Sequence, residues 1–160
     1  MNIGVISDTH GLLRPEAVAA LRGSDLIIHA GDVGDPDILQ ALGRLAPVRA
    51  IRGNVDRQPW ARKLPATHVV EAGGISIYVL HNVNDLDLNP RAAGFACVIS
   101  GHSHRPSSEM RDGVLYFNPG SAGPRRFRLP ITVGKLAVAK KKLVPEIIEL
   151  SDEGAGELRR

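Results

Sequence analysis

The chain has 160 residues, of which 43% are hydrophobic and 23% charged, and its formal net charge is +3. These values are typical of one globular domain that is long enough to bury a core. No apolar run approaches 18 residues and no secretory signal pattern is present, so we expect no membrane-spanning segment and a cytoplasmic location. The single cysteine, Cys97, lies in an apolar run, which favours a buried thiol in a reducing compartment over a nucleophile.

The charge is unevenly distributed along the chain. Residues 1–104 carry 9 basic and 10 acidic groups, whereas residues 105–142 carry 9 basic and 2 acidic groups, a net of +7. This asymmetry is consistent with an anionic partner, but also with solvated surface charge, since Lys140–Lys142 fit a hairpin turn. Nucleic acid is only weakly supported, because we expect no aromatic residues interleaved with these charges, as a single-strand groove would need.

Strand and helix patterns alternate through the first third of the chain. The predicted elements are a strand at Asn2–Ser7, a helix at Glu16–Leu21, a strand at Leu26–His29, a helix from Asp35 to about Leu45 and a strand at Val48–Ile51. This alternation predicts right-handed crossovers and a parallel sheet.

The pattern then changes to strands alone. The predicted strands are Thr67–Glu71, Ile75–Leu80, Phe95–Ser100, Val114–Phe117, Ile131–Ala139 and Leu143–Leu150. The first two flank Ala72-Gly73-Gly74 and the last two flank the lysine turn, so both pairs are predicted to be hairpins. We predict one α/β domain over residues 1–150, with two mixed sheets facing each other, helices outside, and a flexible tail at 151–160.

Polar side chains follow five of the predicted strands. The apolar strand Leu26–His29 leads into Gly31-Asp32, and other strand ends show the same feature. The full set is Asp8, His10, Asp32, Asn54, His81, His102 and His104. Each has an ordinary alternative, such as a helix cap for Asp8 or a turn residue for Asn54. Because reactive groups in open α/β sheets gather at the carboxyl edge of the strands, we interpret the set as one site.

The residue types in this set indicate metal chemistry. Seven carboxylate, imidazole and amide ligands are too many for one tetrahedral zinc, but they suit two divalent ions that share one carboxylate. Mixed ligation of this kind favours Mn, Fe, Zn or Ni. The chain shows no Ser/His/Asp order and no glycine-rich phosphate loop.

The motifs that carry these residues are Asp8-x-His10, Gly31-Asp32, Gly53-Asn54-x-Asp56, His81 and Gly101-His102-x-His104. From about Met1 to Leu150 the chain resembles the calcineurin-like metallophosphoesterases. The chain resembles their compact, YfcE-like phosphodiesterase branch in its small size and in the motif Asn118-Pro119-Gly120-Ser121.

The resemblance implies a four-layer α/β/β/α sandwich of two mixed sheets with a dimetal site at one edge, in which Mn is the favoured metal. The implied ligands of the first ion are Asp8, His10 and His104, and those of the second are Asn54, His81 and His102. Asp32 is the implied bridge, and Asp32, Asn54 and His81 the implied catalytic set. The implied reaction is hydrolysis of a small phosphate ester, most simply a phosphodiester, by in-line attack of a hydroxide that bridges the metals.

Two positions depart from the family pattern. Val55 stands where many relatives have a histidine that protonates the leaving group, so we expect a preference for good leaving groups such as aryl phosphodiesters. His81 is followed by Asn82-Val83 where relatives usually show Gly-His, so the loop beyond it is expected to differ.

Other residues are expected around the ligands. Arg52, Arg57 and Arg125 are candidates for gripping the substrate phosphate, although solvation is the alternative for each. His29 is expected to be buried behind the site, and Asp56 to orient a ligand imidazole.

Two other functions are compatible with the same pattern. The first is an interaction scaffold like the retromer scaffold subunit, which resembles the family in fold but has a degraded metal site. The second is a nuclease or nucleotide hydrolase that uses the basic segment 105–142. Homo-oligomerisation is expected from the resemblance alone.

Overall fold

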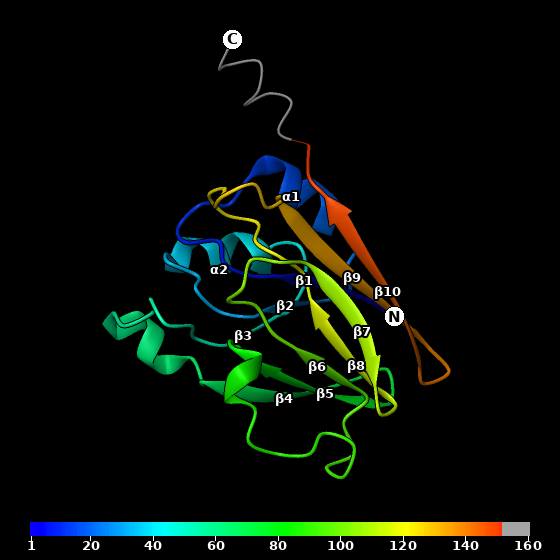
Figure 1. The fold of residues 1–160 in the computed structure, drawn as a ribbon. Coiled ribbons are helices and arrows are strands. Elements are labelled where there is room, and N and C mark those ends of the chain that lie inside the picture. The colour runs from blue at the N-terminus through cyan, green and yellow to red at the C-terminus, as the bar shows by residue number, and fades with distance from the viewer. Residues whose placement is uncertain (152–160) are drawn as a thin grey trace.

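The computed structural model describes residues 1–151 (Figure 1), so the predicted tail lies outside the described residues except for Ser151. The strands are β1 (Asn2–Ile6), β2 (Leu26–His29), β3 (Val48–Ala50), β4 (Thr67–Ala72), β5 (Ile75–Leu80), β6 (Cys97–Ile99), β7 (Ser107–Arg111), β8 (Val114–Asn118), β9 (Thr132–Ala139) and β10 (Lys142–Glu149). The helices are α1 (Pro15–Leu21) and α2 (Pro36–Gly43), with short 3-10 helices η1 (Pro59–Lys63) and η2 (Val83–Asp85).

The strands form two five-stranded mixed sheets, as predicted. The first has the order β10-β9-β1-β2-β3, in which β1, β2 and β3 are parallel and β9 and β10 form the predicted terminal hairpin. The second has the order β4-β5-β6-β8-β7. Here β5, β6 and β8 are parallel, so this half of the chain is less antiparallel than its sequence indicated.

Three apolar clusters hold the layers together. The central cluster fills the space between the sheets, with Ile3 and Ile28 from the first sheet against Ile77 and Phe117 from the second. A second cluster joins α1 and α2 to the outer face of the first sheet. The third covers the outer face of the second sheet, where Leu86, Leu88 and Phe95 pack on Tyr78 and Val98. This outermost layer consists of η2 and loop where helices were expected.

Local sequence explains how the helices begin. Pro15 and Pro36 stand at first-turn positions, where the missing N–H costs nothing. Asp35 caps α2, since its side chain accepts a hydrogen bond from the Asp37 backbone N–H at 2.9 Å. Within residues 1–151, no helix has the length and apolarity needed to cross a membrane.

Cys97 is buried in β6, and burial raises the pKa of its thiol to about 12. A thiol with so high a pKa is a poor nucleophile near neutral pH, so the structure agrees with the prediction of an inert cysteine.

Candidate metal centre

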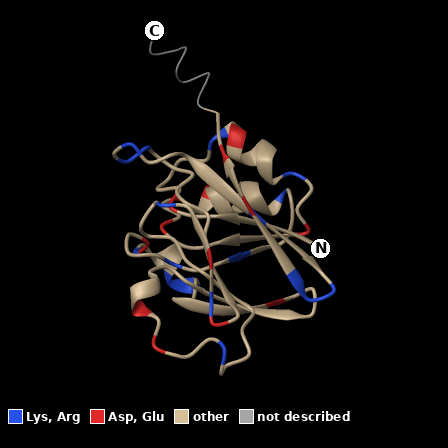
Figure 2. Ribbon diagram, turned by 45° about the vertical axis from the view of Figure 1, so that its right-hand side comes forward, with Lys and Arg blue, Asp and Glu red and all other residues tan. Residues whose placement is uncertain are grey.

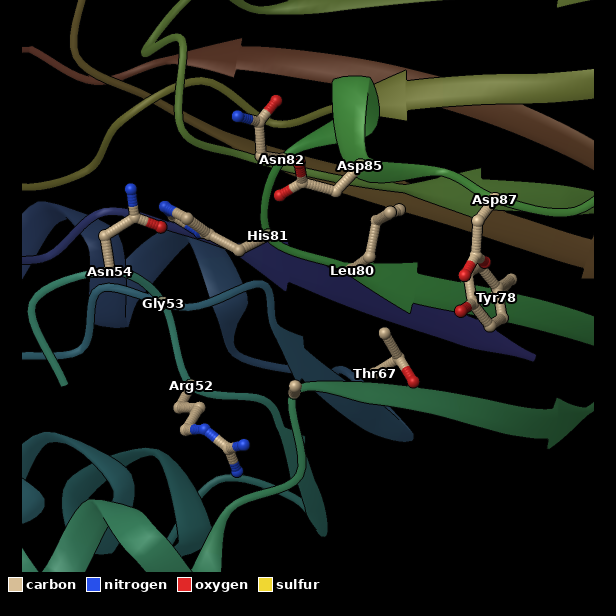
Figure 3. Close-up of a pocket in the computed structure, with 11 residues that line it drawn as sticks. Arg52, Gly53, Asn54, Thr67, Tyr78, Leu80, His81, Asn82, Asp85 and Asp87 are labelled. Atoms are coloured by element: carbon tan, nitrogen blue, oxygen red, sulfur yellow. The ribbon is translucent and has the colours of Figure 1, made fainter. Parts of the chain in front are cut away.

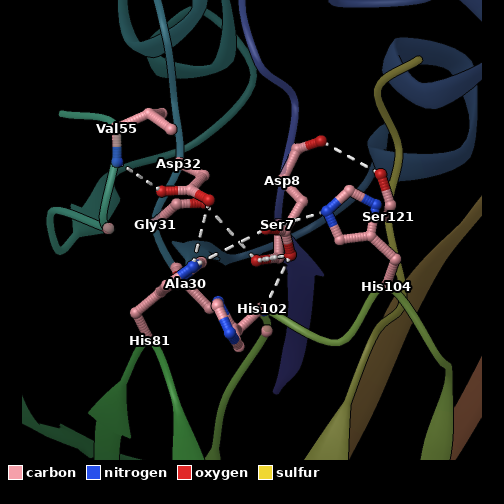
Figure 4. A network of polar contacts seen from close by, with 12 residues as sticks. Ser7, Asp8, Ala30, Gly31, Asp32, Val55, His81, His102, His104 and Ser121 are labelled. Atoms are coloured by element: carbon pink, nitrogen blue, oxygen red, sulfur yellow. Dashed lines mark hydrogen bonds and ion pairs between the residues drawn. The ribbon is translucent and has the colours of Figure 1, made fainter. Parts of the chain in front are cut away.

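The loops that follow four strands converge at one edge of the molecule (Figure 4). Asp8 and His10 follow β1, Asp32 follows β2, His81 follows β5, and His102 and His104 follow β6. Five of these six residues have a positive φ: Asp8 (56°), His10 (46°), Asp32 (56°), His102 (69°) and His104 (62°). Left-handed backbone at residues other than glycine is uncommon and costs of order 1–3 kcal/mol each, and it concentrates at functional sites.

Backbone hydrogen bonds hold the first two loops against each other. The Asp8 N–H donates to the Gly31 carbonyl at 3.0 Å, and the His10 N–H donates to the Asp32 carbonyl at 2.9 Å. In the second sheet, the Gly101 N–H donates to the His81 carbonyl at 2.9 Å and holds the loops after β5 and β6 together. The strained residues are therefore fixed by the surrounding loops.

Two aspartates lie at the middle of the site. Asp8 Oδ1 lies 3.5 Å from His104 Nε2 and 3.7 Å from the Nε2 atoms of both His10 and His81. Asp32 Oδ2 lies 3.1 Å from His81 Nε2 and 3.6 Å from His10 Nε2. One oxygen of each carboxylate thus faces the imidazoles.

The opposite oxygen of each carboxylate is anchored. Asp8 Oδ2 accepts hydrogen bonds from Ser7 Oγ at 2.8 Å and from the His102 N–H at 3.1 Å. Asp32 Oδ1 accepts one from the Val55 N–H at 3.1 Å. These anchors orient the inward oxygens.

The four imidazoles form two pairs. The ring centroids of His10 and His104 are 5.3 Å apart, and so are those of His81 and His102. The resemblance implied the same pairing of imidazoles, and their assignment to two ions stays a prediction. By their potential ligand atoms, Asp8, His10 and His104 form one group that could hold a metal, and Asp8, Asp32 and His81 form another.

Several buried polar atoms in this cluster lack a partner. Among the described residues, Asp8 Oδ1, His10 Nε2, His81 Nε2 and His104 Nδ1 are buried without a hydrogen bond. A buried polar atom without a partner costs about 1–3 kcal/mol or more. Three of these four atoms face one another, since the Nε2 atoms of His10 and His81 both lie 3.7 Å from Asp8 Oδ1. Since carboxylates and imidazoles are both ligands of divalent transition metals, the residues fit such ions.

The proton of His81 is placed so that its inward nitrogen can bind a metal. His81 Nδ1 lies 2.7 Å from the Ala30 carbonyl oxygen, which only accepts, so Nδ1 carries the proton and Nε2 presents a lone pair in the neutral ring. Burial acts to lower the pKa of this imidazole, but the adjacent Asp32 carboxylate and the hydrogen bond to Ala30 outweigh burial and raise this pKa above its ordinary value.

The carboxylates are held in their charged form. Burial acts to raise the pKa of Asp8, but the nearby imidazoles of His10 and His104 outweigh burial and hold this pKa well below the ordinary value of 3.8. Burial likewise acts to raise the pKa of Asp32, but the neighbouring His81 imidazole and the hydrogen bond from the Val55 N–H outweigh burial and lower this pKa overall. Two ionised aspartates give the centre the negative charge that cations require.

Two glycines make room for the aspartates. A Cβ at Gly53 would overlap the carboxylate and backbone nitrogen of Asp32, and one at Gly101 would overlap Ser7 Oγ and approach Asp8 Oδ2 within 2.6 Å. The two Gly-x motifs of the sequence thus serve close packing around the carboxylates.

The predicted residues Asn54 and His102 lie at the rim and are exposed. Asn54 and His81 line one pocket of about 390 Å³, whose other walls include Thr67, Tyr78 and Asp85 (Figure 3). Asn54 therefore lies beside the centre, on the side where the protein opens to solvent.

The three predicted phosphate-gripping arginines bond to backbone carbonyls. Arg52 Nη1 donates to Leu64 O at 2.5 Å, Arg57 Nε to Asn54 O at 3.1 Å, and Arg125 Nη1 to Leu129 O at 3.1 Å. Arg57 holds the Asn54 loop through its bond. For all three, contact with a substrate stays a prediction.

His29 is fully buried behind the centre and bonds to the backbone of the ligand loop. Its Nδ1 accepts the Gly31 N–H at 3.1 Å, so Nε2 carries the proton toward Thr9 Oγ1, 3.0 Å away. Thr9 Oγ1 in turn donates to the Val33 carbonyl at 2.8 Å. This chain of bonds joins the loop of Asp8 to the loop of Asp32.

Asp56 does not orient an imidazole as expected. Its buried carboxylate accepts hydrogen bonds from the backbone N–H groups of Val33, Gly34 and Gly53, at 3.0, 3.0 and 2.9 Å. Asp56 ties the loops after β2 and β3 together, since its carboxylate is held by three backbone N–H donors.

Sequence reasoning assigned no role to Asn118, which is buried beside the histidine loop. Its Nδ2 donates to the Gly101 carbonyl at 2.9 Å and to Ser103 Oγ at 3.2 Å, so it braces the loop between His102 and His104. The only signal in the sequence was a polar residue at a strand end before Pro-Gly.

Comparison with known proteins gives a consistent result. Residues 1–141 match the family described as the calcineurin-like phosphoesterase superfamily domain. A probable metallophosphoesterase from Methanothermobacter thermautotrophicus is 37% identical over 164 residues, covering 92% of each chain.

Solved structures share the fold. An archaeal phosphodiesterase superposes with a TM-score of 0.76 at 25% identity, covering 92% of this chain and all of the other. Vps29 from Chaetomium thermophilum superposes with a TM-score of 0.75, covering 94% of this chain and 97% of the other. At 17% identity, the second likeness shows the fold alone.

Proposed function

Because the chain belongs to the calcineurin-like phosphoesterase superfamily, whose members are metal-dependent hydrolases of phosphate esters, we propose that it is a phosphodiesterase with two divalent metal ions. The similar archaeal structure is that of a phosphodiesterase, which supports the diester as the substrate. Manganese is the proposed metal, with iron, zinc or nickel as alternatives.

One observation carries this proposal: the inward oxygens of two ionised aspartates face three imidazole Nε2 atoms at 3.1–3.7 Å. Four of the atoms in this cluster are buried without partners within the described part of the chain. A protein that used this edge only as a binding face would gain nothing from buried, unpaired groups.

The proposed ligands of the first ion are Asp8, His10 and His104, which form one of the two groups that could hold a metal. Those of the second are Asn54, His81 and His102, with Asp32 as the proposed shared ligand. When bound, such ions supply a nucleophilic water of lowered pKa and neutralise charge on the phosphoryl oxygens.

The chain itself orients this chemistry. The anchoring bonds from Ser7 and Val55 fix the two carboxylates, and the Ala30 carbonyl fixes the tautomer of His81. The pocket bordered by Asn54 and His81 offers room for one ester substituent. The side chain of Val55 is an exposed isopropyl group, so it cannot donate a proton to the leaving group.

A substrate panel tests the proposal. Bis(p-nitrophenyl) phosphate, a cyclic nucleotide and p-nitrophenyl phosphate are each assayed with Mn, Ni, Zn and Mg. We expect metal-dependent hydrolysis that is fastest for the aryl diester. Asp32→Asn is the diagnostic variant, because asparagine tolerates the φ of 56° and keeps an acceptor for the Val55 N–H.

Asp112→Asn is the matched control. Asp112 also has a positive φ, of 51°, and its exposed carboxylate pairs with Arg91. We expect Asp32→Asn to abolish hydrolysis and Asp112→Asn to preserve it. A wild-type protein that binds no transition metal and hydrolyses nothing would instead support the interaction scaffold.

A further inference from the structure

The loop between β8 and β9 presents an unusual tip. Arg125 to Arg128 are exposed, and Phe127 exposes 86% of its surface, the highest value among the exposed large hydrophobic residues described. The chain has three phenylalanines, and the other two pack in apolar clusters. Figure 2 shows the basic tip as a protruding loop, away from the lysine-rich β9–β10 hairpin.

Phe127 is held in this position by strained backbone. Its φ is 56°, and the Leu129 N–H closes the turn by donating to the Arg126 carbonyl at 3.2 Å. A bulky side chain in the left-handed region is a genuine outlier. Position 127 therefore combines a strained backbone with an exposed large apolar ring. A ring that projects into water with arginines on each side is suited to binding a partner.

The loop is rooted in the metal centre. Ser121 Oγ donates to the Asp8 carbonyl at 3.0 Å, and Arg14 Nη2 donates to the Gly123 carbonyl at 3.3 Å. The Ser121–Ile131 bridge closes its base. Phe127 is four positions beyond Gly123 along the chain, so the tip lies within about 14 Å of the root.

A further positive charge lies on the same side of the centre. Arg105 is exposed and directly follows the proposed ligand His104. The next residue, Pro106, lies within 3.2 Å of the position a Cβ would take at Gly120, which begins this loop. Basic groups thus lie at the centre and at the tip.

We propose that the tip formed by Arg126, Phe127 and Arg128 binds single-stranded nucleic acid, with the base stacked on Phe127 and phosphates against the two arginines. Stacking on an aromatic ring between cationic side chains is how proteins bind single strands without sequence preference. The expectation that aromatic residues do not interleave with the basic segment is wrong at this position. One part of the inference rests on the proposed phosphodiesterase function, namely that the phosphodiester linkages of the bound strand are the substrate.

The partner's chemistry favours a nucleic acid over a lipid surface. A membrane-inserting loop gains affinity from buried apolar area. Here a single exposed ring has arginines on both sides, and the nearest apolar residue, Leu129, is half-buried. The bases of a single strand supply flat surfaces that can stack on the Phe127 ring. The phosphates of the same strand can pair with Arg126 and Arg128.

Binding is tested with the metal-loaded protein and a labelled 12-nucleotide phosphorothioate oligothymidylate, which resists hydrolysis, by fluorescence anisotropy. We expect Phe127→Leu, which keeps an apolar side chain at the same strained position, to weaken binding at least about five-fold. Phe127→Trp keeps the aromatic face and should retain affinity. Arg126→Gln/Arg128→Gln should lower the slope of log K against log salt by about 1.4.

Lys140→Asn/Lys141→Asn is the matched control, since it removes two charges from another turn with positive φ. We expect it to leave the dissociation constant within about two-fold of wild type. Equal binding by wild type and Phe127→Leu would overturn the proposal, as would binding to phosphatidylserine vesicles without binding to the oligonucleotide. Hydrolysis of the aryl diester without oligonucleotide binding would overturn this inference alone, whereas binding without hydrolysis of any ester would overturn the proposed function.

Discussion

Val55 leaves the candidate site without a proton donor next to Asn54. Its side chain is 45% exposed at the rim, and its N–H is already used by Asp32 Oδ1, so the backbone there is fixed. Hydrolysis of an ester with a poor leaving group needs a proton, whereas nitrophenolate leaves without one.

Val55→His is therefore expected to improve hydrolysis of alkyl diesters by about ten-fold or more, with little effect on nitrophenyl diesters. The ratio of kcat/KM for the two substrates measures this. Val55→Asn is the control, because it adds polarity without an acid and should leave the ratio at its wild-type value. An unchanged ratio in Val55→His would show that the proton comes from elsewhere.

His29 makes stability depend on pH. Burial lowers the pKa of its imidazole from 6.5 to about 4. Between these values the unfolded chain binds a proton that the folded protein does not. The free energy of unfolding therefore falls as pH drops from 6.5 to 4, by about 3 kcal/mol from this group.

The comparison with His29→Gln isolates this effect, measured by urea unfolding with a chelator present. The variant should lose less stability than wild type over the same pH interval, whatever its starting value. Asp8 and Asp32, whose pKa values are lowered, cost stability only as the pH falls below about 4. Parallel pH profiles for the two proteins would contradict the assignment.

At the scale of elements, the loops after β1, β2 and β3 depend on one another. Gly53 lets the β3 loop approach the carboxylate of Asp32, and Asp56 ties the same loop to Val33. A side chain at position 53 must therefore displace Asp32 or the loop itself.

Gly53→Ala is expected to weaken metal binding about ten- to hundred-fold, as changes behind a metal ligand typically do. Isothermal titration with Mn²⁺ measures this. Gly43→Ala is the control: no atom lies within 4 Å of a Cβ there, and the helical position should gain up to about 1 kcal/mol of stability. Unchanged affinity in Gly53→Ala would show that the close approach is not needed.

Elements with a strong local pattern could be predicted from the sequence. β2 and β5 match their predicted bounds, and α2 begins directly after Asp35, close to its predicted start, because Asp35-Pro36 is a local signal. β7 was missed: all five of its residues are exposed, so it has no apolar alternation, and only pairing with β8 makes it a strand. Hydrogen bonds between distant residues left no local trace either, as Asn118 and Asp56 illustrate.

The site followed from strand ends because topology places them together. Asp8, Asp32 and His81 each follow a buried strand, so a rule about sheet edges was enough to group them. The sequence could not indicate which carboxylate oxygen faces inward, since that is fixed by Ser7 and Val55. Nor could it show the exposure of Phe127, which depends on a turn of positive φ.

Over the whole molecule, the candidate metal centre lies where two sheets meet at the edge of the apolar cluster that fills the space between them. Asp8, His10, Asp32 and Asn54 come from the first sheet, and His81, His102 and His104 from the second. Without a metal, this edge combines left-handed backbone with unpaired buried groups. Ligand binding that satisfies these groups in the folded state alone must raise the stability of the whole domain.

Addition of Mn²⁺ at about 100 times its dissociation constant should stabilise the chelator-treated protein by about 2.7 kcal/mol. For a domain of this size that corresponds to a rise in Tm of about 5–10 °C. Asp32→Asn should lose most of this rise and Asp112→Asn should keep it, because only the former carboxylate faces ligands from both sheets. Differential scanning calorimetry measures the shift, and an equal rise in both variants would mean that manganese binds elsewhere on the protein.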